Sequence, residues 1–176
     1  LDTVELVSMK LNANSPEAMS YFFQVRELAL KFAHRLDLDQ IHVLELVFKD
    51  FNTDFDNDFV ERRNSFSSKE HQSADIDLNG KVVGIYSLVD DAAKRAAAFI
   101  TDQFPNCSVK LNNDKQCTEK LRSIAKNADL FVFASKASKH QAFYCIKNHR
   151  PASLSEILMP AGKGSTSIIR SLMNAV

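Results

Sequence analysis

The sequence predicts an α/β protein in which an α-helical hairpin precedes an open, parallel four-stranded sheet. Two patterns predict this fold class. Apolar residues recur at steps of three or four over residues 15–63, and short apolar runs alternate with helical patterns over residues 80–176. The stretch between them is rich in Ser, Asp and Asn. We therefore divide the chain into a helical hairpin (residues 1–63), a linker (residues 64–79) and an α/β domain (residues 80–176).

The helical hairpin is predicted from two amphipathic segments. The first helix begins with Ser15 as its N-cap, Pro16 in its first turn and acidic Glu17. The second follows a short break at Asp37 and carries a Phe-rich apolar stripe, so we expect one long helix that extends toward Arg63. So short a connection predicts antiparallel packing, with the Phe side chains buried on each other and on a second domain or a second chain.

The α/β domain is predicted from four apolar runs, at residues 81–89, 107–111, 130–134 and 154–159. A helix is expected after each run. The residues expected to cap three of these helices are Asp90 with Asp91, Ser138, and the hydroxyls of residues 165–167. Alternating strands and helices form right-handed βαβ units, so the sheet should be parallel, with strand order 2-1-3-4. This arrangement is Rossmann-like or flavodoxin-like.

Composition excludes several classes of protein. The chain has 176 residues, 45% of them hydrophobic, and is therefore folded rather than disordered. Its 22 Lys and Arg balance its 22 Asp and Glu, so no overall positive field favours nucleic acid, although a local basic patch could bind it. Without a long apolar run or a signal-like start, we expect a cytoplasmic protein that does not enter a membrane. Because the chain opens with Leu1, we expect it to be a piece of a longer protein.

The three cysteines, Cys107, Cys117 and Cys145, form no C-x-x-C pair. An odd number without paired spacing predicts reduced thiols, and not a disulfide framework or a zinc knuckle. Cys145 and His149 lie one helical turn apart and could share a metal, but no third ligand with suitable spacing is visible. We therefore predict no metal site and no cofactor.

The carboxyl ends of the parallel strands predict a ligand-binding edge. Three loops meet helix N-termini there, at residues 87–91, 134–140 and 160–167. The third combines glycines, helix amides and a lysine, which together attract anions, and the second is also basic and hydroxyl-rich. Ordinary βα loops contain the same residue types, so the prediction depends on both loops lying at one edge. The candidate ligand-binding residues are Ser87, Ser135, Ser138, Lys139, His140, Lys163, Gly164, Ser165 and Thr166.

Common nucleotide and metal motifs do not match. Residues 162–165 read Gly-Lys-Gly-Ser, whereas a Walker loop needs Ser or Thr directly after the lysine. No G-x-G-x-x-G follows the first strand. Asp54, Asp56 and Asp58 alternate as in a calcium loop, but Phe59 occupies the position that needs glycine.

Four short motifs resemble an uncharacterised bacterial family of small Rossmann-like domains: ADLFVF at residues 128–133, SKHQA at 138–142, CIK at 145–147 and GSTSIIRSL at 164–172. In that family an acidic residue opens the third strand, a Ser-His or Ser-x-His follows it, and a lysine lies further along the helix. The resemblance covers residues 81–172 and leaves out the hairpin. It implies a Rossmann-like fold and a pocket, with no settled activity.

Three classes of function follow from these features. The leading hypothesis is a ligand-sensing or regulatory module of a larger bacterial protein, which binds a phosphate-bearing small molecule such as a nucleotide. The first alternative is protein assembly, including a homodimer, through Phe51, Phe55 and Phe59. The second is an enzyme that processes a nucleotide or phosphoester with His140 as acid or base. A hydrolytic triad of Ser87 and His140 with a nearby Asp lacks a nucleophile elbow, so we favour a role without catalysis.

Overall fold

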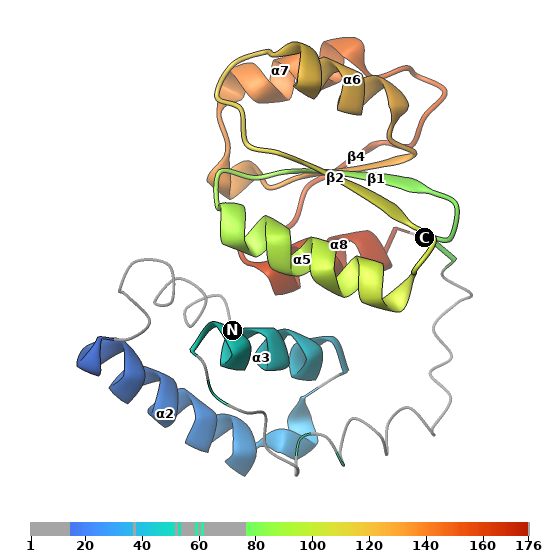
Figure 1. Ribbon diagram of the computed structural model, residues 1–176. Coiled ribbons are helices and arrows are strands. Elements are labelled where there is room, and N and C mark those ends of the chain that lie inside the picture. The colour runs from blue at the N-terminus through green and yellow to red at the C-terminus, as the bar shows by residue number, and fades with distance from the viewer. Residues whose placement is uncertain are drawn as a thin grey trace. The chain divides into compact units, whose positions relative to one another are not determined.

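The computed structural model describes residues 15–36, 38–51, 53, 59, 61 and 77–175. The chain forms two compact units, Leu1–Asp75 and Ile76–Val176, which are described separately below (Figure 1). Most of the predicted linker, up to residue 76, lies outside the described residues.

The first unit begins with helix α2 (Pro16–Lys31). Ser15 is its N-cap and accepts a hydrogen bond from the backbone N–H of Ala18 at 3.2 Å, which confirms the predicted start. The helix ends at Phe32, and the short 3-10 helix η1 (Ala33–Arg35) follows. Helix α3 (Leu38–Asp50) then runs back past α2 (Figure 1).

The prediction of one helix that continues toward Arg63 is wrong, because α3 ends at Asp50. Thr53 is not helical, and its backbone N–H and its hydroxyl both donate to the carbonyl of Phe48, at 3.0 and 3.1 Å. Two bonds to one carbonyl close the last turn of the helix. Phe59 and Glu61 are helical again, whereas residues 54–58, 60, 62 and 63 lie outside the described part of the chain.

Phe side chains form the core of the first unit, as the stripes predicted. The Phe22 ring stacks on Phe51, with centroids 4.5 Å apart, and meets Phe48 edge-on at 4.9 Å. Phe59 contacts Phe48 at 6.1 Å. Phe51 and Phe59 are buried within the described residues, and Phe55 lies outside them, so the predicted role of these three residues in assembly stays a prediction.

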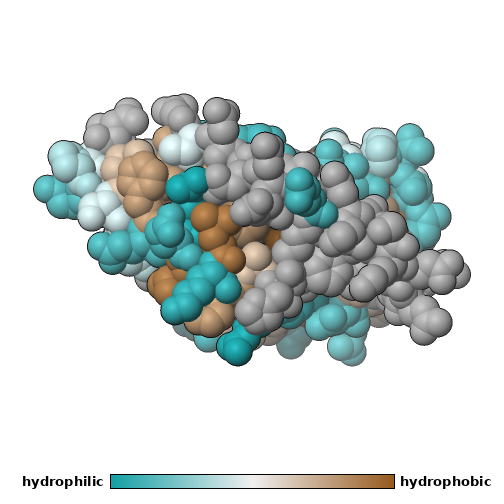
Figure 2. All heavy atoms as spheres, turned by 90° about the horizontal axis from the view of Figure 1, so that it is seen from below, coloured by the Kyte–Doolittle hydropathy of each residue, from teal (hydrophilic) through white to brown (hydrophobic). Residues whose placement is uncertain are grey.

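The exposed large apolar residues of this unit lie on or next to α2 instead: Phe23, Leu28 and Phe32. Figure 2, which views the molecule from below, shows hydrophobic side chains at the surface among hydrophilic ones. Scattered apolar side chains of this kind are ordinary on protein surfaces. They carry no proposal of assembly by themselves.

The second unit contains one parallel sheet in the order β2-β1-β3-β4, which confirms the predicted fold class and strand order. Its strands are β1 (Val82–Tyr86), β2 (Ser108–Asn112), β3 (Leu130–Phe133) and β4 (Ile157–Leu158). Strand β4 is shorter than the predicted residues 154–159. Arg150 donates to the carbonyl of Ser155 at 2.8 Å and holds the preceding residues in a turn.

Two helices cover each face of this sheet (Figure 1). Helices α5 (Asp90–Gln103) and α8 (Ser165–Met173) pack together on one face, and α6 (Glu119–Asn127) and α7 (His140–His149) pack together on the other. Gly84 lets α6 approach the sheet closely, because a Cβ atom there would lie 2.8 Å from the Phe131 ring and 2.9 Å from Ile124. Among the described helices, none combines the length and hydrophobicity that crossing a membrane requires.

A hydrogen-bond network fastens the amino edge of the sheet. The Arg150 guanidinium donates to the carbonyls of Ala125, Ala128 and Asp129, and also to the carbonyl and the hydroxyl of Ser155, at 2.8–3.3 Å. The carboxylate of Asp129 accepts from the backbone N–H of Val82 at 2.7 Å. The acidic residue that opens the third strand, which the resemblance singled out, therefore joins β3 to β1 at the edge opposite the predicted site.

Candidate ligand-binding site

The four helices of the second unit begin at the carboxyl edge of the sheet, and their N-termini differ. Helix α6 is capped by Thr118, whose hydroxyl accepts from the backbone N–H of Leu121 at 3.2 Å. Helices α5, α7 and α8 have Val89, Lys139 and Gly164 at the N-cap, and none receives a side-chain capping bond. Their first N–H groups therefore point out of the helix without the usual side-chain acceptor.

The predicted caps of these three helices are wrong for a common reason. Asp90, Asp91 and Ser165 lie inside the first turn of their helices and not before it. Ser138 precedes Lys139, and its hydroxyl donates to the carbonyl of Ser135 at 2.8 Å. A short polar side chain can bond to several nearby backbone groups, and sequence alone does not determine which one it selects.

Ser87 lies in the turn after β1, and its predicted binding role stays a prediction. Its side chain is completely buried, and its hydroxyl oxygen accepts from the backbone N–H of Val89 at 3.0 Å. That bond closes the turn after β1. The backbone N–H of Leu88 donates to the carbonyl of Ala137 at 2.8 Å and so ties this turn to the loop after β3.

The loop after β3 contains the short 3-10 helix η2 (Ser135–Ala137) and leads into α7. Ser135, Lys139 and His140 are exposed. Because His140 is the first residue of α7, its ring lies beside helix N–H groups that carry partial positive charge. The prediction that Lys139 and His140 lie at the start of a helix on this edge is confirmed, whereas their binding role stays a prediction.

Tyr86 stabilises this loop through a ring contact and hydrogen bonds that sequence analysis did not predict. Its ring stacks on Phe133 at 5.2 Å, and its hydroxyl donates to the carbonyl of Asp114 at 2.8 Å. Burial raises the pKa of Tyr86 above 10.0, whereas a hydrogen bond from the backbone of Lys139 lowers it. The hydroxyl therefore stays protonated at neutral pH and joins the loops after β2 and β3.

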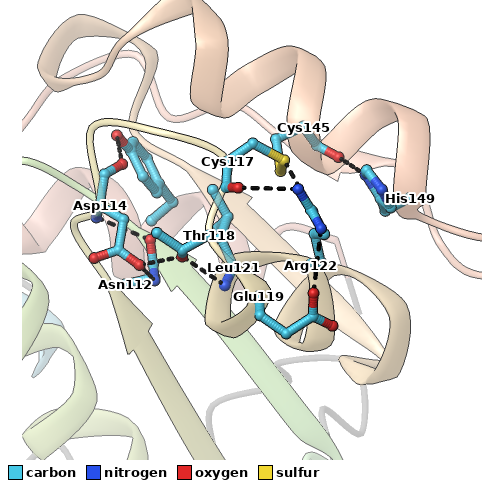
Figure 3. The surroundings of a disulfide bond; sticks show 10 residues. Asn112, Asp114, Cys117, Thr118, Glu119, Leu121, Arg122, Cys145 and His149 are labelled. Atoms are coloured by element: carbon cyan, nitrogen blue, oxygen red, sulfur yellow. Dashed lines mark hydrogen bonds and ion pairs between the residues drawn. A yellow bond between two sulfur atoms is a disulfide. The ribbon is translucent and has the colours of Figure 1, made fainter.

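A second network closes the edge above β2 (Figure 3). Asn112 donates from its side chain to the carboxylate of Asp114 at 2.8 Å, and the backbone N–H of Asp114 returns a bond to the Asn112 side chain at 3.0 Å. The hydroxyl of Thr118 also donates to that carboxylate. These bonds from Thr118 and Asn112 lower the pKa of Asp114. The polar groups of this corner are thus used within the protein.

The start of α8 is arranged differently. Gly164 and Ser165 are buried, Lys163 is half-buried, and Thr166 is 8% exposed. The hydroxyl oxygen of Thr166 is buried and has no hydrogen-bond partner among the described residues. A buried polar atom without a partner is uncommon in folded proteins and calls for an explanation.

Charge separates the three helices without a capping bond. Helix α5 carries Asp90 and Asp91 in its first turn, and Asp90 pairs with Lys94 at 2.5 Å. These carboxylates already oppose the partial positive charge of its N-terminus. Helices α7 and α8 have no acidic residue in the first turn, and Lys139 and Lys163 stand just before them. The electrostatics therefore favour an anion near the ends of the adjacent strands β3 and β4, and not near β1.

A family model described as DpdD-like matches residues 1–171. The chain belongs to the DpdD-like family. The match includes the helices that the sequence resemblance, limited to residues 81–172, left out. No curated protein and no solved structure matches the chain significantly.

In this DpdD-like chain the prediction of reduced, unpaired thiols is wrong for two of the three cysteines. The structure joins Cys117 to Cys145 in a disulfide, and Cys145 is buried (Figure 3). Their separation of 28 residues gave no signal, because the two sulfurs meet only when α6 and α7 pack together. Cys107 is the remaining cysteine, and its burial raises the pKa of its thiol.

Proposed function

We propose that the second unit is a ligand-binding module that holds a phosphate-bearing molecule, such as a nucleotide, where α7 and α8 begin. A regulatory or sensing role within a longer protein is part of this proposal. The observation that carries it is the Thr166 hydroxyl, which is buried in the first turn of a helix without a side-chain cap and has no hydrogen-bond partner among the described residues.

Burying a hydroxyl without a hydrogen-bond partner lowers the stability of the fold by about 1–3 kcal/mol. A contribution to stability therefore does not explain the buried Thr166 hydroxyl. A phosphate oxygen at the start of α8 would accept from this hydroxyl and from backbone N–H groups of the first turn. The glycine at the N-cap has no side chain to keep a ligand away from the backbone. The three features together support an anion site.

The lysines supply the charge that such a site needs. Lys163 stands directly before Gly164, and Lys139 and His140 open the helix that follows the neighbouring strand. The Ser87 hydroxyl, which is used in its own turn, is left out of the proposed site. The proposed site thus takes its charged and polar groups from two loops, one before α7 and one before α8, as phosphate-binding sites commonly do.

The test is a thermal-shift screen of inorganic phosphate and nucleotides against the intact chain. A ligand at ten times its Kd stabilises the folded state by about 1.4 kcal/mol, which raises the midpoint by about 5 °C or more. We expect Thr166→Val and Lys163→Ala to lose this shift. Lys126→Ala, which removes an exposed lysine from the far end of α6, is the matched control and should keep it.

The proposal fails if phosphate and nucleotides leave the midpoint of the folded chain unchanged, or if the control variant loses the shift as completely as Lys163→Ala. His140→Ala separates binding from catalysis. We expect this variant to bind and the intact chain to release no product from the bound nucleotide. Turnover that depends on His140 would instead establish the enzymatic alternative.

A further inference from the structure

A second group of chemically active side chains lies away from the proposed ligand site. Cys117 stands just before α6, and Cys145 and His149 lie on α7. Their sulfur and ring-nitrogen atoms all lie within 4.8 Å of one another. The helix that carries Cys145 and His149 packs against α6, so tertiary structure supplies the third ligand that sequence spacing did not reveal.

One ring nitrogen of His149 is hydrogen-bonded within its own helix. Its Nδ1 atom lies 2.8 Å from the carbonyl oxygen of Cys145 (Figure 3). When Nδ1–H donates to that carbonyl, Nε2 keeps its lone pair, which is the form of imidazole that binds metals.

Arg122 contacts both the sulfur and the carbonyl of Cys117. Its Nε donates to the Cys117 sulfur at 3.4 Å and its Nη2 to the Cys117 carbonyl at 3.3 Å, while Glu119 holds the guanidinium at 3.2 Å. A metal-bound sulfur carries negative charge, and this guanidinium places a positive charge beside it.

We propose that the reduced chain binds one Zn²⁺ through Cys117, Cys145 and His149. Thiolate and imidazole donors select Zn²⁺ among the common divalent ions, and three such ligands leave a fourth position for water. Zn–S and Zn–N bonds of about 2.3 and 2.0 Å place tetrahedral ligand atoms about 3.5–3.8 Å apart. The nitrogen must approach the sulfurs slightly from the observed limit of 4.8 Å, and the sulfurs must separate.

Metal binding and the disulfide exclude each other. Reduction of the Cys117–Cys145 disulfide by an added phosphine or dithiol delivers two electrons and two protons and yields two thiols. Binding of Zn²⁺ then releases those two protons, because both sulfurs bind as thiolates. The site is independent of the proposed phosphate site, since it lies on the α6 and α7 face and uses none of the same residues.

The test uses the intact chain, reduced and then freed of reductant without oxygen, and titrated with Co²⁺ as a spectroscopic substitute for Zn²⁺. We expect one equivalent of Co²⁺ to give thiolate-to-metal absorption in the near ultraviolet and bands in the visible, and Zn²⁺ to abolish both. Bound Zn²⁺ should also protect Cys117 and Cys145 from alkylation in the native chain.

Four variants separate the metal site from a simple disulfide. Cys117→Ser, Cys145→Ser and His149→Gln should weaken Co²⁺ binding by more than the roughly 10–100-fold that loss of an outer partner costs. Cys107→Ser, which changes a buried cysteine outside the cluster, should bind as the parent does. His149→Gln changes a half-buried side chain and leaves the disulfide able to form, so it tests the metal site even if the cysteine variants unfold.

The inference is overturned if the reduced, folded chain shows no thiolate-to-cobalt absorption, or if His149→Gln binds Co²⁺ as tightly as the parent. Either result would identify Cys117 and Cys145 as a disulfide pair alone.

Discussion

The two edges of the sheet in the second unit differ in how they use their polar groups. At the amino edge Arg150 makes five hydrogen bonds, and Asp129 accepts from the first residue of β1. At the carboxyl edge two helices begin without a side-chain cap or an acidic first turn, and the buried Thr166 hydroxyl finds no partner among the described residues. The polar groups of the amino edge bond to one another, whereas the carboxyl edge contains a buried hydroxyl without a partner among the described residues.

The carboxyl edge itself is divided. Above β2, Asn112, Asp114 and Thr118 use one another, and Tyr86 joins them to the loop before α7. At the start of α8, the buried Thr166 hydroxyl has no hydrogen-bond partner among the described residues. The comparison teaches that position at the carboxyl edge does not identify a site by itself. The useful signal is a helix N-terminus with a polar group that lacks a hydrogen-bond partner within the protein.

The largest effect is expected at the amino edge. Arg150→Ala removes five hydrogen bonds and should lower the free energy of unfolding by about 2–4 kcal/mol, measured by urea denaturation. Arg150→Lys keeps the charge but cannot reproduce the planar fork, so it should fall between the alanine variant and the parent. Neither variant should change the affinity of the folded chain for phosphate. A change below about 0.5 kcal/mol in Arg150→Ala would show that the amino edge is not the stabilising one.

The same substitution at two helix starts sharpens the contrast within the carboxyl edge. Thr118→Val removes a cap and a bond to Asp114, so it should destabilise the protein by about 1–2 kcal/mol. Thr166→Val removes a hydroxyl without a partner among the described residues and should be neutral, or stabilising by up to about 1 kcal/mol, in the absence of ligand. Chemical denaturation of both variants decides the matter, and equal losses of stability would contradict the division of this edge.

The smallest effect is a pH dependence at Asp114. Hydrogen bonds from Thr118 and Asn112 lower the pKa of this carboxyl in the folded state below 3.8. The ionised carboxylate therefore stabilises the protein above pH 3.8. This stabilisation is lost as the pH falls through the lower pKa of the folded state. The effect is small because solvent screens a half-exposed carboxylate.

Asp114→Asn should accordingly be less stable than the parent at about pH 6, and the gap should narrow as the pH is lowered below 3.8, as urea midpoints measured across this range would show. A gap that stays constant with pH would mean that the charge of Asp114 contributes nothing to stability.

The elements of the second unit and the order of its strands were predictable, because apolar runs, helix periodicity and the handedness of βαβ units are properties of short segments. The start of α2 was predictable for the same reason, since Ser15 and Pro16 act locally. The end of α3 was not. A single residue, Thr53, closes a helix that the Phe pattern alone would have continued.

The candidate site was predictable only in part. Sequence located Lys139, His140, Lys163 and the glycine loop at one edge, but it did not predict that the Ser87 hydroxyl bonds within its own turn. Tyr86 and Arg150 were missed because most of their partners lie 20 or more residues away and come together only through the sheet. The meeting of Cys117 and Cys145 was missed for the same reason.

The disulfide has a mechanical consequence. It joins two cysteines at a sequence separation of 28, and the loop between them includes α6, the central strand β3 and the start of α7. In a chain pulled from its two ends, force passes through the bond and bypasses this covalent loop. The oxidised chain therefore conceals a contour length of about 90–100 Å that the reduced chain releases when it is unravelled. Whether this cysteine pair is oxidised or reduced thus sets how far the second unit can be stretched.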